Sequence, residues 1–396
     1  MALSLAERAR LISPSATIAM AQKARDLKAQ GRTVLDFTLG ESDFDTPENV
    51  GRAAWRAIER GKTRYTPAAG IPELRDAVAR LYRDRGLETV AKQVVISNGA
   101  KHSLHNAFMA LINPGDEVIV PAPFWVSYAD LIRLAGGVPV ILNTNESDDF
   151  KLKPEAFRAA VTPRTRLLLL NSPSNPTGMV YSREEQTALA DAILETEVGV
   201  VSDEIYEQLI FDGTEPVCFA TLRPGLADRV VTISGVSKSY AMTGWRIGWA
   251  VAPPAIASFM ADLQSQETSN PSSISQHAAL EAITGPQDSV REMREEFARR
   301  RLHALERVAE LPEVTCRPPG GAFYLFMNVS AHYGRTLGGR LVANSTEFCM
   351  TALETAGVAL VMGEAFGADD YVRMSYATDL ETIDQGFDAL ADFLKK

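Results

Sequence analysis

The sequence predicts an α/β protein with a large domain, built on a mostly parallel sheet between layers of helices, and a smaller α/β domain. Three observations favour this class. Apolar runs recur between Val94 and about residue 252, helical stretches separate many of them, and several runs are hydrophobic at every position. Strands covered by helices on both faces give such continuous runs, and alternation with helices favours parallel pairing. The length of 396 residues exceeds what one simple core usually serves, which favours a second domain.

Composition argues against several kinds of partner. The formal net charge is −10, whereas nucleic acids and anionic membranes favour basic surfaces. No run reaches the ~18 apolar residues of a membrane span, and the first residues lack an apolar core behind a basic start, so we expect no signal peptide. The cysteines, Cys218, Cys316 and Cys349, are far apart with no CxxC pair. They fit a reducing cytoplasm, and we expect neither a disulfide framework nor a metal site.

Residues 1–45 are predicted to form an N-terminal arm and part of the small domain. Apolar and polar residues alternate from Thr17 to Lys28, which indicates one amphipathic helix that ends near Gly31. The next segment, TLGESDFDTP, is rich in glycine and acidic residues and ends in proline, so we expect a loop. By residue type alone, Gly40 in this loop is a turn glycine.

Residues 46–285 are predicted to form the large domain. A loop and a helix occupy residues 62–82, with Pro72 near the first helical turn. Tyr65, in that loop, is by itself interpreted as a packing tyrosine. The apolar runs of the sheet then follow as VVIS, EVIVPAP, VPVIL, RLLLLN, VGVVSD, VVTISG and IGWAVAPP.

Polar groups follow these runs where strands should end, which is the edge at which open α/β sheets bind ligands. The turn NGAK places Gly99, Ala100 and Lys101 between a strand and a helix. Backbone N–H groups at a helix N-terminus can bind phosphate. The turn is no Walker motif, and taken alone it is weak evidence for a phosphate site.

Four more residues occupy similar positions. Trp125 follows EVIVPAP, where its ring either packs in the core or stacks on a cofactor. Asn175, in NSPSNPTG, can donate to a phenolic oxygen or a carboxylate. Asp203 ends an apolar strand, where a carboxylate is costly unless a cation such as a protonated pyridinium nitrogen pairs with it. Tyr206, three residues on, can donate a hydrogen bond to a ligand bound beside Asp203.

The segment SGVSKSYAMTGWRIGWA contains the residue on which we expect the chemistry to depend. Lys238 lies where a buried strand gives way to a turn; a lysine there is solvated, ion-paired or kept neutral for chemistry. A lone lysine is usually a surface residue. Small neighbours such as Ser237, and Arg246 eight residues on, favour an anion site beside it instead. A neutral lysine beside a phosphate site is what a pyridoxal phosphate enzyme needs.

Residues 286–396 are predicted to form the small C-terminal domain. The stretch REMREEFARRRLHALERV mixes both signs of charge, which indicates an exposed amphipathic helix rather than a nucleic-acid patch. Shorter β-like runs follow, and one of them contains Arg373. A strand arginine is usually solvated or ion-paired, but its planar fork also suits a substrate carboxylate.

The lysine segment resembles that of fold-type I, class I aminotransferases, most closely the bacterial aspartate aminotransferases with the motif SK-x-x-x-MTGWRIG. The resemblance extends over nearly the whole chain, from LISPSATIAM through NGAK, NSPSNPTG, DEIY and RMSYA. It implies pyridoxal phosphate as the cofactor, with Lys238 as the Schiff-base lysine. The cofactor is held by Gly99, Ala100, Lys101, Trp125, Asn175, Asp203, Tyr206, Ser237 and Arg246. Tyr65 is implied to reach the phosphate of a neighbouring subunit, so a homodimer with shared sites is expected.

The resemblance also implies how these residues act. Lys238 moves the proton between the substrate Cα and cofactor C4′, Asp203 keeps the pyridine nitrogen protonated, and Tyr206 tunes O3′. The substrate is bound by Gly40, Trp125, Asn175, Lys101 and Arg373, of which Arg373 orients the α-carboxylate and Lys101 is credited with the second carboxylate. Gly235 stands where some aspartate enzymes have a phosphate-binding serine, which puts that contact in doubt.

The function that this resemblance implies is transamination between L-aspartate or L-glutamate and 2-oxoglutarate or oxaloacetate. Relatives that accept prephenate carry a lysine where this chain has Ser13, which puts prephenate activity in doubt. The alternatives are an aminotransferase with aromatic, alanine or prephenate specificity and a pyridoxal phosphate-dependent lyase on the same fold. A regulatory protein is a third, but it would need a DNA-binding module, which the acidic composition opposes.

Overall fold

The computed structural model describes residues 3–12 and 14–395. Ser13, on which the prephenate prediction depends, lies outside the described residues. The described part contains one main sheet in the spatial order β2-β8-β7-β6-β5-β3-β4. Its strands are β2 (Val94–Ser97), β3 (Glu117–Ala122), β4 (Val138–Asn143), β5 (Thr165–Asn171), β6 (Gly199–Asp203), β7 (Val230–Gly235) and β8 (Gly248–Val251).

The main sheet is mostly parallel, as the sequence predicts. Only β8 runs antiparallel to its two neighbours, β2 and β7, while the pairs from β7 to β4 are parallel. Antiparallel pairing lets β8 follow β7 without a crossover helix, through residues 236–247, which contain Lys238. The expected α/β class is therefore confirmed.

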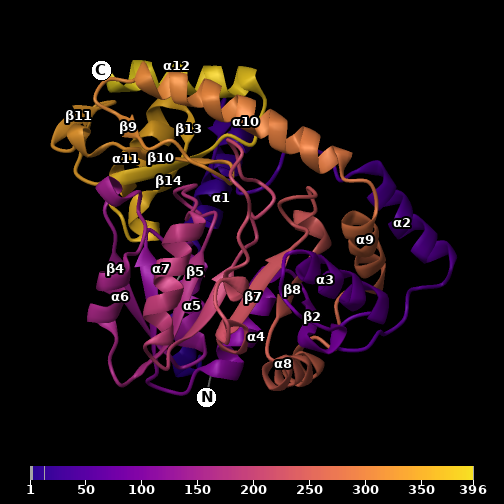
Figure 1. The fold of residues 1–396 in the computed structure, drawn as a ribbon. Coiled ribbons are helices and arrows are strands. Elements are labelled where there is room, and N and C mark those ends of the chain that lie inside the picture. Colours follow the sequence, from indigo (N-terminus) through magenta and orange to yellow (C-terminus); the bar gives the residue numbers. More distant parts are fainter. Residues whose placement is uncertain (1–2, 13, 396) are drawn as a thin grey trace.

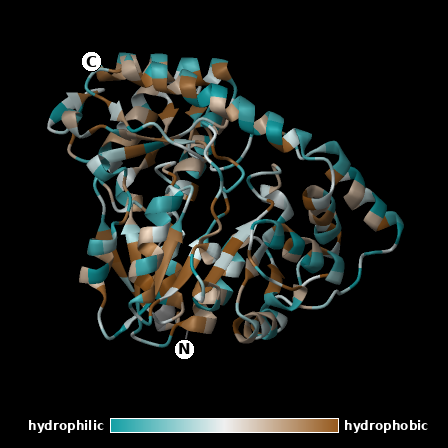
Figure 2. Cartoon of the chain, in the orientation of Figure 1, coloured by the Kyte–Doolittle hydropathy of each residue, from teal (hydrophilic) through white to brown (hydrophobic). Residues whose placement is uncertain are grey.

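Helices cover both faces of this sheet (Figure 1). One face packs against α3 (Pro72–Asp84), α7 (Arg183–Leu194) and α9 (Ser273–Thr284); the other packs against α4 (Ala100–Leu111), α5 (Ser127–Leu134) and α8 (Pro254–Glu267). Within β5, Leu168 and Leu170 belong to the first core, and Leu167 and Leu169 belong to the second. Because both faces are dry, the strand is apolar at consecutive positions, and Figure 2 shows these strands as the most hydrophobic part of the fold.

Three further helices complete this part of the chain. Helix α2 (Glu48–Glu59) packs on α9, while α6 (Pro154–Ala160) packs on α7. The N-terminal turn of 3₁₀ helix, Glu7–Leu11, contacts α5. Of the described helices, none is long and apolar enough to cross a membrane.

A second, smaller unit combines both ends of the chain. It contains α1 (Ala16–Ala29) and β1 (Leu35–Asp36), which pairs in parallel with β13 (Val358–Ala359). A four-stranded sheet of described residues has the order β14-β15-β10-β9, with β9 (Thr315–Cys316), β10 (Tyr324–Asn328), β14 (Val361–Met362) and β15 (Tyr371–Ser375). Helices α11 (Ser345–Thr351) and α12 (Leu380–Leu394) and the hairpin β11 (Arg335–Leu337)–β12 (Arg340–Val342) complete it. The boundaries at residues 45 and 285 stay predictions.

The long helix α10 (Asp288–Ala309) runs along α12 and on toward α9 (Figure 1). The expectation of an exposed helix is wrong for part of it. Arg300 and Arg301 are buried, at 7% and 4% exposure. Each is neutralised by an acid from another segment, Asp43 for Arg300 and Asp212 for Arg301. The local charge pattern could not reveal these distant partners.

Candidate active site

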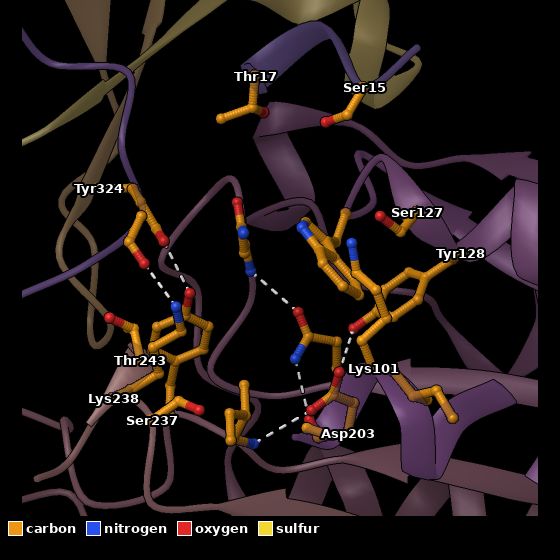
Figure 3. A pocket seen from close by; sticks show the side chains of 18 of the residues that line it. Ser15, Thr17, Lys101, Ser127, Tyr128, Asp203, Ser237, Lys238, Thr243 and Tyr324 are labelled. Atoms are coloured by element: carbon orange, nitrogen blue, oxygen red, sulfur yellow. Dashed lines mark hydrogen bonds between the residues drawn. The ribbon is translucent and has the colours of Figure 1, made fainter. Parts of the chain in front are cut away.

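A cavity of about 280 Å³ lies at the carboxyl ends of the parallel strands, between the large and small units. The structure brings most of the predicted site residues together there (Figure 3). Those that line the cavity are Gly40, Ala100, Lys101, Trp125, Asn175, Asp203, Tyr206, Ser237, Lys238, Arg246 and Arg373. Most of them follow β2, β3, β5, β6 or β7, as the rule for open α/β sheets predicts, whereas Gly40 follows β1 and Arg373 lies in β15.

Lys238 lies three residues beyond the end of β7, and its Nζ donates to the backbone oxygen of Gly40. Burial and, to a smaller extent, the positive charge of Arg373 lower the pKa of the Lys238 ammonium to about 8. The Nζ atom lies 5.9 Å from the centre of the Tyr206 ring. Such an amine has a larger neutral fraction near neutral pH than an ordinary lysine, which suits it to act as a nucleophile.

Asp203, at the end of β6, is 3% exposed. Its Oδ2 accepts a 2.7 Å hydrogen bond from the Tyr128 hydroxyl, and its Oδ1 accepts one of 3.2 Å from the Ile205 N–H. Burial raises the pKa of Asp203 to about 6, although these two bonds and the charge of Lys238 oppose the rise. The carboxylate thus has neutral donors beside it and would gain from a cationic group in the cavity.

Arg373, in β15, is 1% exposed. It donates from Nη1 to Asn175 Oδ1 at 2.9 Å and from Nη2 to the Thr38 backbone oxygen at 2.6 Å, while Nε has no protein partner. Among the described residues, no acid lies within ion-pair distance of it. Burial lowers the pKa of Arg373. A desolvated guanidinium that has only neutral acceptors is suited to bind a carboxylate.

Tyr206 and Tyr324 contact each other through their hydroxyl groups, close to Lys238. Their hydroxyl oxygens are 2.7 Å apart, and the Tyr324 ring lies 4.5 Å from the Arg373 guanidinium carbon. A Cβ at Gly40 would overlap the Tyr324 hydroxyl. The absence of a side chain at Gly40 therefore leaves room for the tyrosine pair.

Positive groups gather at the N-terminus of α4. Gly99 caps this helix with a φ of 85°, and a Cβ there would collide with the Arg246 guanidinium. Arg246 donates to the backbone oxygens of Thr243, at 2.8 Å, and Asn98, at 3.3 Å. Burial lowers the pKa of Lys101, as does the charge of Arg246. Together with the helix dipole, these groups form a cup for an anion such as a phosphate.

The arrangement fits the group that the sequence implies. The anion cup, the amine of Lys238 and the buried carboxylate of Asp203 border one cavity. Each matches one part of pyridoxal phosphate: phosphate, aldehyde and pyridine nitrogen. Trp125 also lies on the wall, with its ring 4.8 Å from Lys101 Nζ.

Several residues on the cavity wall were missed from the sequence. Tyr128 and Asn171 hold predicted residues in place. Tyr128 donates to the Asp203 carboxylate. The Asn171 amide donates to the Asp203 backbone oxygen and accepts from the Asn175 N–H, both at 2.9 Å. Ser15, Thr17, Ser127 and Tyr324 also line the cavity (Figure 3). Tyr128 had one available signal, its position a helical turn after Trp125. Asn171 and Ser127 also lie close in sequence to predicted residues, at the start of NSPSNPTG and two residues after Trp125, whereas Ser15, Thr17 and Tyr324 come from the segments of the smaller unit.

Tyr65 lies apart from the cavity of its own chain. Its side chain is 90% exposed, in a surface hollow that it shares with Arg64, Thr268 and Asn270. Its implied role at a neighbouring subunit therefore stays a prediction.

Comparison with known proteins places this geometry in context. Residues 32–390 match the family described as aminotransferase class I and II. The chain is 45% identical to an aspartate aminotransferase of Geobacillus stearothermophilus, over 99% of each chain. It is 47% identical to an aspartate/prephenate aminotransferase of Cereibacter sphaeroides, over 94% of each. The crystal structure of an aspartate aminotransferase from Rhizobium meliloti superposes with a TM-score of 0.96 at 41% identity, covering 100% of this chain and 99% of that one.

Proposed function

We propose, from the premise that this chain belongs to the class I and II aminotransferases, that it uses pyridoxal phosphate to exchange amino groups between dicarboxylic acids. The pairing proposed is L-aspartate or L-glutamate with 2-oxoglutarate or oxaloacetate. One observation carries the proposal: the low-pKa amine of Lys238 shares a cavity with Arg373, a buried cation that has no acid partner among the described residues.

The chain's own groups are suited to hold the cofactor. Gly99, Ala100, Ser237 and Arg246 would bind the phosphate, and Trp125 would cover the ring. Asp203 would pair with the pyridine nitrogen, while Asn175 and Tyr206 would donate to O3′. When bound, pyridoxal phosphate supplies an aldehyde carbon for covalent attachment and a ring that withdraws electrons from the substrate Cα.

Lys238 has two tasks in this proposal. Its amine would hold the cofactor covalently, and as a free base it would move a proton between the substrate Cα and cofactor C4′. A base works best when its pKa lies near the operating pH. The pKa of Lys238, lowered to about 8 mainly by burial, leaves roughly a tenth of the side chains neutral at pH 7, against fewer than one in a thousand for an ordinary lysine.

Arg373 and Asp203 act at opposite ends of the reacting group. Arg373 holds the α-carboxylate by its planar fork, which fixes the direction of the Cα–H bond. Tyr128 and the Ile205 N–H each donate to Asp203, which favours its ionised form. An ionised Asp203 keeps a positive charge at the pyridine nitrogen.

Preference for a dicarboxylic substrate is supported by the second cation. Lys101 lines the same cavity as Arg373, and all three proteins named above are aspartate enzymes by name. A screen of amino donors and oxo acids tests the proposal. We expect aspartate and glutamate to exceed alanine and phenylalanine in kcat/KM, with Lys101→Ser reducing that preference. Ammonia and pyruvate as products would instead indicate the lyase alternative.

A homodimer with shared sites is also proposed. Tyr65 is 90% exposed in the single chain, so its hydroxyl is free to reach the phosphate of a neighbouring subunit. Light scattering at assay concentration should give twice the chain mass, and a fully active monomer would exclude the shared site. The free cysteines suit the cytoplasmic location that we propose.

A further inference from the structure

The five residues from Asp203, the last residue of β6, to Glu207 divide between two environments. Asp203, Ile205 and Tyr206 line the cavity. Glu204 and Glu207 bind groups outside it, and their exposures are only 3% and 6%. The segment DEIYE thus presents two of the proposed site residues on one side and two buried acids on the other. The proposed mechanism uses neither acid.

The two buried acids have different partners. Glu204 Oε1 accepts hydrogen bonds from the Ser202 hydroxyl at 2.8 Å and the Phe219 N–H at 3.2 Å. Both of these donors are neutral. Glu207 accepts a 3.1 Å bond from the Ser234 hydroxyl and forms an ion pair with the guanidinium of Arg85. Only Glu207 therefore has a cation in direct contact.

The charges in this cluster do not balance if both acids ionise. The groups that face the acids from neighbouring elements are Tyr82 and Arg85 at the end of α3, Cys218, and Tyr240 after β7. Arg85 is the one cation among these described groups, so two carboxylates would leave one unpaired buried charge. Such a charge is costly, and a proton removes the cost. Burial, helped by repulsion from Glu207, raises the pKa of Glu204 to about 8.

We propose that Glu204 stays a neutral acid beside the Glu207–Arg85 ion pair, and that this buried cluster positions Asp203 and Tyr206 toward the cavity. The positioning part rests on the proposed function. Ser234 links the pieces, because its hydroxyl contacts both the Glu204 backbone oxygen, at 3.4 Å, and the Glu207 carboxylate. Ser234 belongs to β7, which leads directly to Lys238. The cluster thus connects the Asp203 segment to the lysine turn.

Protonation of Glu204 predicts that the folded chain becomes less stable as the pH rises. A carboxyl whose pKa is higher in the folded chain than in the unfolded chain binds an extra proton on folding between the two values. Its contribution to stability is complete below about 4.5 and is lost as the pH rises through about 8. Glu204→Gln keeps the shape and a neutral group, so it should remove this loss. Its Tm relative to wild type should therefore increase from pH 5 to pH 8, by at least ~2 °C.

Matched variants decide which acid has the proton. Glu207→Gln removes the partner of Arg85 and should lower Tm at every pH, whereas the exposed Glu215→Gln should follow wild type throughout. Parallel Tm curves for wild type and Glu204→Gln between pH 5 and pH 8 would overturn the proposal. It would equally fail if Glu207→Gln, rather than Glu204→Gln, were the stabilised variant at pH 8.

Positioning is tested by cofactor affinity, followed by the absorbance change as the chain binds pyridoxal phosphate. Glu204→Ala removes the acceptor of both hydrogen bonds and should raise Kd about tenfold, because small displacements of site groups have large effects. Glu204→Gln should restore wild-type Kd. Equal Kd values for Glu204→Ala and wild type would overturn the positioning role. If wild type itself bound no pyridoxal phosphate, the proposed function would fail, and the Tm profiles would still decide the protonation.

Discussion

Two buried arginines, Arg301 and Arg373, differ in whether an acid neutralises them. Arg301, in α10, donates from both Nη atoms to Asp212 at 2.7 Å and also to the Pro319 backbone oxygen. Arg373, in β15, has only the neutral oxygens of Asn175 and Thr38. Both are less than 5% exposed, and both leave Nε without a partner. Since burial is alike, the difference is the counter-charge.

The same contrast extends to the surroundings of the two arginines. Along α10, each of Arg300, Arg301 and Arg307 is paired with at least one acid. Around the cavity, Lys101, Lys238, Arg246 and Arg373 form no ion pair within 4 Å with any residue that the structure describes. An acidic protein that leaves these cations unpaired at one place retains a site for anionic ligands there.

Replacing each arginine gives the largest contrast. Arg373→Gln should lower kcat/KM for aspartate by roughly 10³-fold, about 4 kcal/mol, because the α-carboxylate loses its bidentate partner. Its Tm should hold, since no internal ion pair is broken. Arg301→Gln should lower Tm, because the buried side chain loses its bonds to Asp212 and to the Pro319 backbone oxygen, and kcat/KM should stay within about threefold of wild type. Equal losses of kcat/KM in the two variants would remove the distinction.

The acids provide the mirrored comparison, with a smaller expected effect. Asp203→Asn keeps the size of the side chain but loses the charge opposite the pyridine nitrogen. We expect kcat to fall at least ~100-fold, roughly 2.7 kcal/mol, with cofactor still bound. Asp212→Asn should instead lower Tm with near-normal kcat. Measuring kcat and Tm on one preparation separates a catalytic role of Asp203 from a structural role. A folded, fully active Asp203→Asn chain would contradict the catalytic role that we assign to Asp203.

The pH dependence of cofactor capture gives the smallest effect. The neutral amine attacks the aldehyde, and burial, with the charge of Arg373, lowers the pKa of Lys238 to about 8. The rate of capture by cofactor-free chain should therefore rise about tenfold from pH 7 to pH 9 and level off above that. Stopped-flow absorbance measures it. A rate that continued to rise toward pH 10.5 would show an ordinary lysine instead.

Much of this fold and site is predictable because the decisive signals are contiguous. Apolar runs such as RLLLLN identify strands buried on both faces, and the residues after those runs must meet at one sheet edge. Asp203, Asn175 and Lys238 were found in that way. The antiparallel β8 was not, since apolar runs specify burial but not direction.

Other features depend on distant partners that no local pattern contains. Arg300 and Arg301 belong to a stretch of mixed charge that resembles an exposed helix, yet both are buried and pair with the loop acids Asp43 and Asp212. In the sequence, Tyr128 and Tyr324 resemble ordinary core aromatic residues. Only the folded chain shows that the Tyr128 hydroxyl contacts Asp203 and that the Tyr324 hydroxyl contacts Tyr206. Likewise, no local pattern in DEIYE shows that Glu204 and Glu207 are buried outside the cavity.

The central claim is that Lys238 is the residue to which the cofactor is attached. Purified protein with pyridoxal phosphate should be yellow, and borohydride should fix the cofactor covalently to the chain. Peptide mapping by mass spectrometry then identifies the modified lysine. Our account predicts the label on the peptide that contains Lys238, and none on that peptide's counterpart in Lys238→Ala. A label on Lys101 or any other lysine, or no covalent label on wild type, would contradict it.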